Sequence, residues 1–454
     1  MASGRLQPVA GPSRRSALCI ALLATLPAAV PVARAAQINY SIGGRVEHSD
    51  NIALTQTNPM EESTLATDVA FDVTQTGRNT TFVANGGVEY LYYTGGLFDD
   101  DVRASLVGQF NWNTWQDRMK VIIEDYANYE PIDVLSPDAP GNQQQVNVFV
   151  AGTQFNLRPG DATRVRLDLR YNNYWAEEND DFNGDRYNAA FTLWQEPSST
   201  TRIGFTVEGS EVQYDQVSLD TLGADYRRLD SYVTWNRNLA NIDLEVRAGY
   251  SWVELTDYNT KDDAPLFRTV LTWRPTSRST LDMGVYYQFS DAAQELMTDV
   301  TDPTGVPANP APGGAPSPDP SDVTIGPDLY RQRRIDIGYR YNGERFDATI
   351  RPYYEDNDYI DPTAQSEGNY GIGVGMSWSI TPSLFLTGSM SAGVRSFDSF
   401  DRDDDDFSVY IGLTKILTRH WSMGFDLRHQ ERDSNANEAS YDENAAIFSV
   451  RYTR

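Results

Sequence analysis

The chain has 454 residues and a formal net charge of −27, with 22% charged and 12% aromatic residues. This composition excludes a disordered chain, and a mean hydropathy of −0.50 excludes a bundle of transmembrane helices. The excess of acidic residues argues against nucleic acid as a partner, because the phosphate backbone is itself negative. The length is ample for a sizeable core.

Residues 1–35 have the features of a secretory signal peptide. A basic Arg14-Arg15 pair is followed by a short apolar run over 18–30 and by the A-x-A cleavage motif Ala33-Arg34-Ala35. A membrane anchor is the alternative, but the apolar run is too short to span a bilayer. We therefore expect a mature chain of 36–454, which lacks cysteine and is more acidic still.

The mature chain alternates apolar and polar residues along most of its length. In the segment NIDLEVRAGYSW, from Asn241 to Trp252, every second residue from Ile242 onward is apolar, and the residues between them are mostly charged. Successive side chains of a strand point to opposite faces, so such a strand has one apolar and one charged face. About twenty segments repeat the pattern, each long enough for the ~9–11 residues of a tilted membrane strand.

The connections between these segments alternate between short and long. The long ones include 49–62, 127–145, 210–225, 256–265, 291–328, 356–369 and 397–406. Bacterial outer-membrane barrels have an even strand number, short periplasmic turns and longer outer loops. A β-sandwich or a propeller gives no reason for loop lengths to alternate. We therefore predict an all-β, transmembrane antiparallel up-and-down β-barrel of about 20 strands (18–22) in the outer membrane, with both termini periplasmic.

The longest connection, 291–328, contains the run PTGVPANPAPGGAPSPDP. Proline and glycine at this density favour an extended segment that packs no core of its own. We therefore predict a mobile extracellular loop within the single barrel domain, 36–454. The alternative is a loop that folds inward and narrows the pore.

If the apolar series face lipid, the intervening charged residues face the lumen. One interpretation is that these charges pair with each other and only cover the inner wall. The other is that they create an electric field that selects and orients a polar solute, and both can hold at once. Tyr286 and Tyr353 are candidates for stacking on sugar rings. The predicted pore-lining residues are Arg164, Arg166, Asp168, Arg170, Asp243, Glu245, Arg247, Arg334, Asp336, Arg340, Asp347, Arg351, Asp426 and Arg428.

Signals for metal binding are weak. Asp180, Asp181, Asn183 and Asp185 surround an Asn-Gly turn, but they lack the twelve-residue spacing and final glutamate of a calcium loop. We expect a solvated acidic loop there and at 403–406. The alternative is a divalent cation that bridges these acids to lipopolysaccharide phosphates. We predict no cofactor.

Signals for catalysis are also weak. The three histidines, His48, His420 and His429, stand beside no recognisable nucleophile and acid. We therefore predict no enzyme and no catalytic residues.

Short motifs resemble a family of outer-membrane β-barrel porins found with exopolysaccharide and exosortase systems. They are Ser49-Asp50-Asn51-Ile52, Pro140-Gly141-Asn142 with Gln145-Val146-Asn147, and Tyr214-Asp215-Gln216 with Asp225-Tyr226-Arg227-Arg228. The resemblance implies a barrel that passes a surface polysaccharide or anchors its export, with polysaccharide export components as partners.

Three hypotheses for function follow. The first is a channel for a polar, saccharide-like solute, and the second is a structural or adhesion barrel whose acidic outer loops bind a cation or a partner. The third, an outer-membrane enzyme, requires an essential histidine. The expected partners of all three are outer-membrane lipid, lipopolysaccharide and the barrel-assembly machinery, and nucleic acid is excluded.

Overall fold

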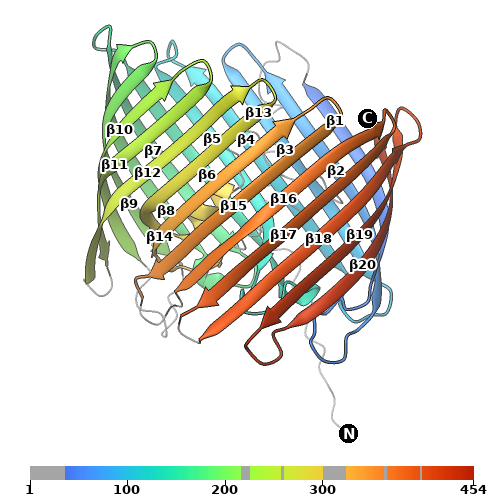
Figure 1. Cartoon of the computed structure of the whole chain (residues 1–454). Coiled ribbons are helices and arrows are strands. Elements are labelled where there is room, and N and C mark those ends of the chain that lie inside the picture. Colours follow the sequence, from blue (N-terminus) through green and yellow to red (C-terminus); the bar gives the residue numbers. More distant parts are fainter. Residues whose placement is uncertain are drawn as a thin grey trace.

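The computed structural model describes residues 36–215, 225–256, 260–299, 324–361, 364, 366–398 and 401–454. In these ranges the chain forms one 20-stranded antiparallel sheet, which closes into a barrel where β1 pairs with β20 (Figure 1). The prediction of an all-β antiparallel barrel of about 20 strands is confirmed. The expected signal peptide, 1–35, lies outside the described residues.

Each strand pairs with its neighbours in sequence, as an up-and-down barrel requires. The strands are β1 Gln37–Ser49, β2 Glu62–Thr76, β3 Thr80–Tyr93, β4 Asp101–Thr114, β5 Met119–Pro131, β6 Gln143–Leu157, β7 Thr163–Ala176, β8 Gly184–Ser198, β9 Thr201–Tyr214, β10 Tyr226–Asn238, β11 Ile242–Leu255, β12 Thr260–Thr276, β13 Ser279–Ser290, β14 Tyr330–Asn342, β15 Phe346–Tyr359, β16 Glu367–Thr381, β17 Leu384–Phe397, β18 Arg402–Ile416, β19 Trp421–Ser434 and β20 Tyr441–Thr453.

The outward face of the barrel is apolar and exposed. On β1, Ile38, Ile42 and Val46 are 60%, 51% and 46% exposed, and on β11 the aromatic pair Tyr250 and Trp252 is 36% and 45% exposed. A closed sheet pairs all its backbone polar groups, and an exposed apolar band around it is the surface that lipid covers. The barrel is therefore of the membrane-spanning, outer-membrane type. None of the described helices is long and apolar enough to cross a membrane.

Both ends of the barrel domain lie at the end with short turns, at the top of Figure 1. There the amide of Tyr40 donates to the carbonyl of Arg454 at 2.9 Å, and Arg454 returns the bond at 2.9 Å. The short turns at this end are 77–79, 115–118, 158–162, 199–200, 239–241, 277–278, 343–345, 382–383 and 417–420. That this end faces the periplasm stays a prediction.

Several strands reach further towards the opposite end than the sequence predicted. The connections expected at 256–265 and 397–406 shrink to 256–259 and 398–401. The strands continue because their charged residues find partners beyond the apolar band. In β12, for example, Asp262 accepts from Arg331 of β14 at 2.7 Å. The predicted alternation of loop length is wrong at these two hairpins.

Pro352, on the apolar face of β15, interrupts one ladder. The β14–β15 register runs through the pair Asp336–Tyr353 and resumes at Tyr339–Ile350, with no pairing between them. On its other side Pro352 pairs normally, opposite Ile372. Proline has no N–H to donate, so the strand keeps its course at the cost of a local gap in the hydrogen bonds.

The closing seam carries an ion pair that spans three strands. Arg451 of β20 donates two bonds, of 3.0 and 3.2 Å, to Asp68 of β2, and one of 3.0 Å to Ser41 of β1. The Asp68 side chain is 4% exposed and that of Arg451 is 23% exposed. Gly43 leaves the space that Asp68 occupies, because an added Cβ would clash with the Asp68 carboxylate.

We predict that Arg451→Gln destabilises the folded barrel by about 1–3 kcal/mol, because it leaves a buried carboxylate without its partner. The measurement is the temperature at which the folded band converts to the unfolded band on a semi-native gel. The double variant Asp68→Asn/Arg451→Gln is expected to regain part of the loss. An unchanged transition in Arg451→Gln contradicts a structural role for the pair.

Candidate functional site

The candidate site is the barrel interior. The predicted pore-lining residues lie on the face of their strands that is opposite to the exposed apolar face. Their charges are largely matched by neighbours. Arg166 contacts Asp168 at 2.7 Å, and Arg247 contacts Glu245 at 2.7 Å. Asp243 pairs with Arg274, at 2.6 Å. That these residues line a conducting pore stays a prediction.

Several partners in the interior come from strands far apart in the sequence. Arg428 of β19 contacts Glu47 of β1 at 2.8 Å and Glu443 of β20 at 3.1 Å. Sequence reasoning singled out Arg428 but neither glutamate. The register of the closing strands brings Glu47 and Glu443 to it, and only the closed barrel defines that register.

The interior also has an apolar patch that sequence reasoning missed. Val146, Val148 and Val150 of β6 point inward and are only 1–2% exposed. Their outward neighbours are polar at Gln145 and Asn147 and apolar at Phe149 and Ala151, so the apolar face changes along the strand and the alternation does not mark these valines as inward. The inward apolar patch, as we call it, consists of Val107, Tyr126, Val146, Val148, Val150, Tyr174, Ala176, Val212, Tyr214, Tyr226, Val253, Ala264 and Phe289.

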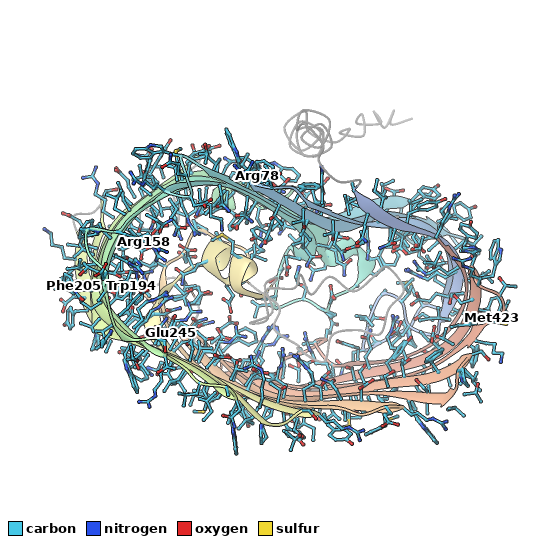
Figure 2. All side chains as sticks on the ribbon, turned by 90° about the horizontal axis from the view of Figure 1, so that it is seen from above. Arg78, Arg158, Trp194, Phe205, Glu245 and Met423 are labelled. Carbon is cyan, nitrogen blue, oxygen red and sulfur yellow. The ribbon has the colours of Figure 1, made fainter. Side chains whose placement is uncertain are left out.

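A short helix packs on this inward apolar patch. It is α2 (Ala292–Asp299), which follows β13 and lies inside the ring of strands in Figure 2, where it is yellow. Ala292, Ala293 and Leu296 are 1–6% exposed against the patch, together with Ile325 and Leu329 from the other end of the same connection. We call residues 291–299 and 324–329 the inward segment.

The inward segment corrects one prediction. Residues 291–328 were expected to form a mobile extracellular loop, with inward folding as the alternative, and both described ends fold into the barrel. The physical reason is that the ends are not proline-rich. Ala292, Ala293 and Leu296 offer an apolar helix face, and the patch offers a surface to bury it. The proline- and glycine-rich middle, 300–323, lies outside the described residues.

Asp291 anchors the start of α2 to the wall. Its Oδ1 accepts from the backbone amide of Gln294 at 2.9 Å, which is an N-cap. Its Oδ2 accepts from Arg186 of β8 and from the hydroxyl of Tyr226 of β10. Arg186 also donates to Tyr226 at 2.8 Å and lies over the ring of Tyr174, 5.5 Å from its centroid. The buried carboxylate therefore ties helix and two strands together.

A second set of contacts holds the helix from other strands. Glu295 accepts from the hydroxyl of Tyr330 and lies 3.4 Å from Arg334, both on β14. Arg228 of β10 donates to the carbonyl of Phe289 at 2.8 Å, just before the helix begins. The helix is thus held by polar contacts from β8, β10 and β14 as well as by its apolar face.

Two connections at the end opposite the short turns contact the inward segment. The side chain of Asn179 donates to the carbonyl of Ile132 at 3.1 Å and to that of Ile325 at 3.0 Å. Short 3₁₀ helices, η1 (Pro140–Asn142) and η2 (Asp180–Phe182), shape these connections. Phe182 is fully buried within the same cluster as α2. The inward segment is therefore braced by the β5–β6 and β7–β8 connections.

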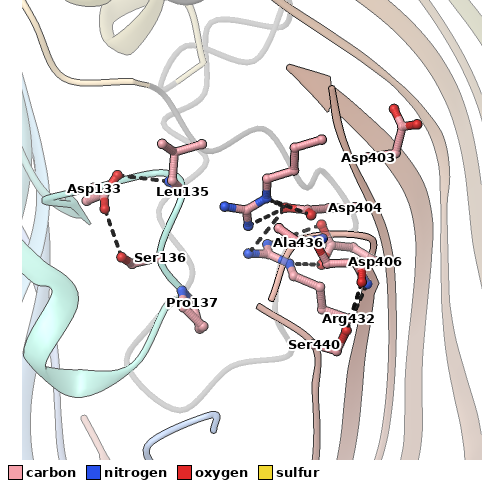
Figure 3. Close-up of polar contacts among 12 residues, drawn as sticks. Asp133, Leu135, Ser136, Pro137, Asp403, Asp404, Asp406, Arg432, Ala436 and Ser440 are labelled. Carbon is pink, nitrogen blue, oxygen red and sulfur yellow. Dashed lines mark hydrogen bonds and ion pairs between the residues drawn. The ribbon is translucent and has the colours of Figure 1, made fainter. Parts of the chain in front are cut away.

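On the opposite wall the acidic run 403–406 is structured. Residues Asp403 to Asp406 belong to β18, and Asp404 is 0% exposed. Arg432 contacts Asp406 at 2.7 Å, and Arg402 contacts Asp404 at 2.7 Å (Figure 3). The expectation of a solvated loop is wrong for Asp404 and Asp406, because Arg402 of the same strand and Arg432 of β19 compensate their carboxylates, whereas Asp403 and Asp405 are exposed.

The weak metal candidates are occupied by local hydrogen bonds. Asn183 donates to Asp180 at 3.1 Å, and Asp185 accepts from Tyr171 at 2.7 Å and from Asn173 at 2.9 Å. Within the described ranges, no group of three or more histidine, cysteine or acidic side chains is arranged to hold a metal ion.

Among the histidines, the structure brings together one pair that the sequence did not reveal. His48 of β1 lies 3.0 Å from the hydroxyl of Ser63 on β2. In the described part of the chain, no carboxylate or amide contacts the other ring nitrogen of His48. A base without an orienting partner lacks the third member of a catalytic triad.

Part of the chain matches a known family. Residues 353–454 match the model of a family described as "Putative beta-barrel porin 2". This region lies outside the motifs Ser49–Ile52, Pro140–Asn147 and Tyr214–Arg228, which carried the sequence resemblance. No curated protein matches the chain.

Three solved structures similar in fold are, by title, two siderophore receptors and an iron transporter. The ferric enterobactin receptor of Pseudomonas aeruginosa has 9% identity and a TM-score of 0.47, over 94% of this chain and 81% of that one. The FrpB iron transporter of Neisseria meningitidis has 10% identity and a TM-score of 0.43, over 91% and 81%. The siderophore receptor PirA of Pseudomonas aeruginosa has 10% identity and a TM-score of 0.43, over 92% and 80%.

The inward segment contains one carboxyl group that is sensitive to pH. Burial, with the negative charges of Asp361 and Asp181 nearby, raises the pKa of Asp328 to about 6 from its usual 3.8. A raised carboxyl pKa means that the docked segment binds the proton more tightly than the released one. Its contribution to docking is full below about pH 4 and is lost as the pH rises through 6.

We predict that the inward segment is better protected at pH 5 than at pH 7.5. The measurement is hydrogen exchange of the backbone amides of 292–297. Asp328→Asn is expected to remove most of the pH dependence, because the amide mimics the protonated carboxyl. The same dependence in Asp328→Asn assigns it to another group, and Asp138→Asn, in the exposed part of the β5–β6 connection, is the matched control.

Proposed function

We propose that the protein is an outer-membrane channel that passes a polar solute through the barrel interior. The observation that carries the proposal is a closed barrel of 20 strands with a charged inward face and a helix that fills only one flank. A barrel of this strand number encloses an aqueous interior unless something fills it. The inward segment then acts as a constriction rather than as a separate plug domain.

The distribution of inward residues supports a polar path beside the helix. The inward apolar patch lies on β4–β7 and β9–β13, where α2 packs against it. The wall opposite carries charged side chains that are partly exposed, such as Arg428 (29% exposed) with Glu47 (14% exposed). Charged groups that face water keep most of their hydration, so this wall is the one along which a hydrated solute passes.

The solute and its direction are a further part of the proposal. The sequence motifs that resemble exopolysaccharide-associated porins favour a saccharide and export, with polysaccharide export components, lipopolysaccharide and the barrel-assembly machinery as partners. The family match at 353–454 supports the porin class only. Swelling of proteoliposomes in neutral sugars of increasing size tests the solute class, and exclusion of every sugar contradicts it.

The second candidate is a structural or adhesion barrel that does not conduct. The specific observation in its favour is the strength of the anchoring. The buried carboxylate of Asp291 binds Arg186 and Tyr226, and Glu295 binds Tyr330. Such contacts keep the constriction in place unless another interaction replaces them.

We predict that the purified barrel conducts ions in planar bilayers, with small steps. Replacing 292–327 by a short Gly-Ser connection is expected to increase the single-channel conductance several-fold, because it removes the constriction. A variant in which only Asp138 becomes Asn, at an exposed position of the β5–β6 connection, is expected to keep the original conductance. Absence of conduction in both wild type and deletion contradicts the channel and favours the structural barrel.

A further inference from the structure

Two arginines face each other across neighbouring strands in the interior. In the β11–β12 register, Arg247 is directly opposite Arg268, and Arg268 is in turn opposite Tyr286 of β13. Like charges directly opposite each other on one face of a sheet are destabilising. The barrel keeps this pair although a single carboxylate in place of either arginine would relieve the repulsion.

Each of the two guanidinium groups is held on an aromatic ring. Arg247 lies over Tyr232, 5.8 Å from the ring centroid, and Arg268 lies over Tyr286, 5.1 Å from its centroid. Stacking on a ring restricts where a guanidinium points and leaves its N–H edge available to an acceptor.

Glycine makes room for the ring of Tyr286. A Cβ added to Gly284 would lie 2.6 Å from Cε2 of Tyr286, whereas one added to Gly249 would meet the neighbouring backbone and Cβ of Tyr232 rather than its ring. The Tyr286 ring therefore lies over Gly284, where a larger residue does not fit. The Tyr286 face that was expected to be free for a sugar ring is covered by Arg268.

The charge of Arg268 is not compensated locally. Arg334 has Asp336 at 3.0 Å, and Arg247 has Glu245 at 2.7 Å. Arg268, by contrast, forms no hydrogen bond or ion pair with the part of the chain that the structure describes, and its Nε is buried without a partner. The Nε of Arg247 is likewise buried without a partner. With Glu245 counted, the pair still carries a net positive charge, and both Nε donors lack an acceptor.

We infer that Arg268 and Arg247 form a binding site for an oxyanion, the carboxylate or phosphate group of a solute in the barrel interior. The guanidinium fork matches either group with two parallel bonds, and a bound anion supplies both the missing acceptor and the missing charge. The inference rests on the proposed function, since the solute reaches the site through the interior. The inference restricts the class of transported solute from polar compounds to anions.

The inferred anion site lies next to the inward segment, which narrows the interior. Tyr286 is opposite Arg334 in the β13–β14 register, and Arg334 contacts Glu295 of α2 at 3.4 Å. On the other side, Leu266 and Ala264 continue the inward face of β12 as buried apolar residues, and Ala264 belongs to the patch under α2. An anion held at Arg268 is therefore adjacent to the segment that narrows the interior.

The experiment measures binding to the folded barrel in detergent, so that conduction is not needed. The probes are glucuronate, inorganic phosphate and, as a neutral comparison, glucose, each followed by equilibrium dialysis of the labelled compound. We expect saturable binding of the anions and none of glucose. Arg268→Gln is expected to weaken anion binding at least tenfold, and Arg268→Lys to restore part of it because the charge remains without the fork.

Arg202→Gln is the matched control. Arg202 of β9 is also stacked on an aromatic ring, Trp194, at 5.6 Å, and Gly204 also makes room for that ring. It differs in having a carboxylate partner, Glu196, at 3.2 Å. Binding in this variant is expected to stay within about twofold of wild type. Should Arg268→Gln fail to fold, Arg247→Gln tests the same site.

The outcomes distinguish a failure of the inferred anion site from a failure of the proposed channel. Saturable binding of glucuronate but not phosphate supports the inference and assigns the site to sugar carboxylates, and the reverse assigns it to phosphates. Absence of saturable binding, or equal loss in Arg268→Gln and Arg202→Gln, overturns the inference. Conduction without anion binding overturns the site and leaves the channel standing, whereas binding without conduction supports the site and contradicts the channel.

Discussion

The fold depends on one constraint, that a backbone in lipid must pair every N–H and C=O with another part of the same chain. The sheet meets it by closure, where β1 pairs with both β2 and β20. Closure also fixes the interior, because it brings Asp68, Ser41 and Arg451 from three strands into one contact. The charged lumen is thus a consequence of the same register that satisfies the backbone.

The barrel was predictable because its two determinants are local. A period of two, seen in segments such as Ile242–Trp252, marks a strand with one lipid face, and hairpin connections order the strands in sequence. The placement of Arg166, Glu245 and Arg428 on the inward face follows from that period alone. Their partners do not all follow, since Glu47 and Arg428 meet only when the sheet closes.

The interior contacts of α2 could not be predicted for a different reason. Asp291 and Arg186 are 105 residues apart, and no local pattern relates them. In β6 the outward neighbours of the inward valines change from polar (Gln145, Asn147) to apolar (Phe149, Ala151), so the period of two does not tell which face of this strand contacts water. Because proline and glycine in 300–323 dominate the composition of the connection, the apolar residues at its two ends did not stand out in the sequence.

The inward valines of β6 have a consequence for any open state. With α2 in place, Val146, Val148 and Val150 touch protein rather than water. If the helix leaves, these side chains and their neighbours become a water-repelling section of the wall, and narrow apolar sections of a pore lose their water and resist ions. Release of the helix therefore removes a steric obstacle but exposes a poorly hydrated apolar surface on the same side of the interior. Ions that pass after release have to follow the charged wall on the opposite side.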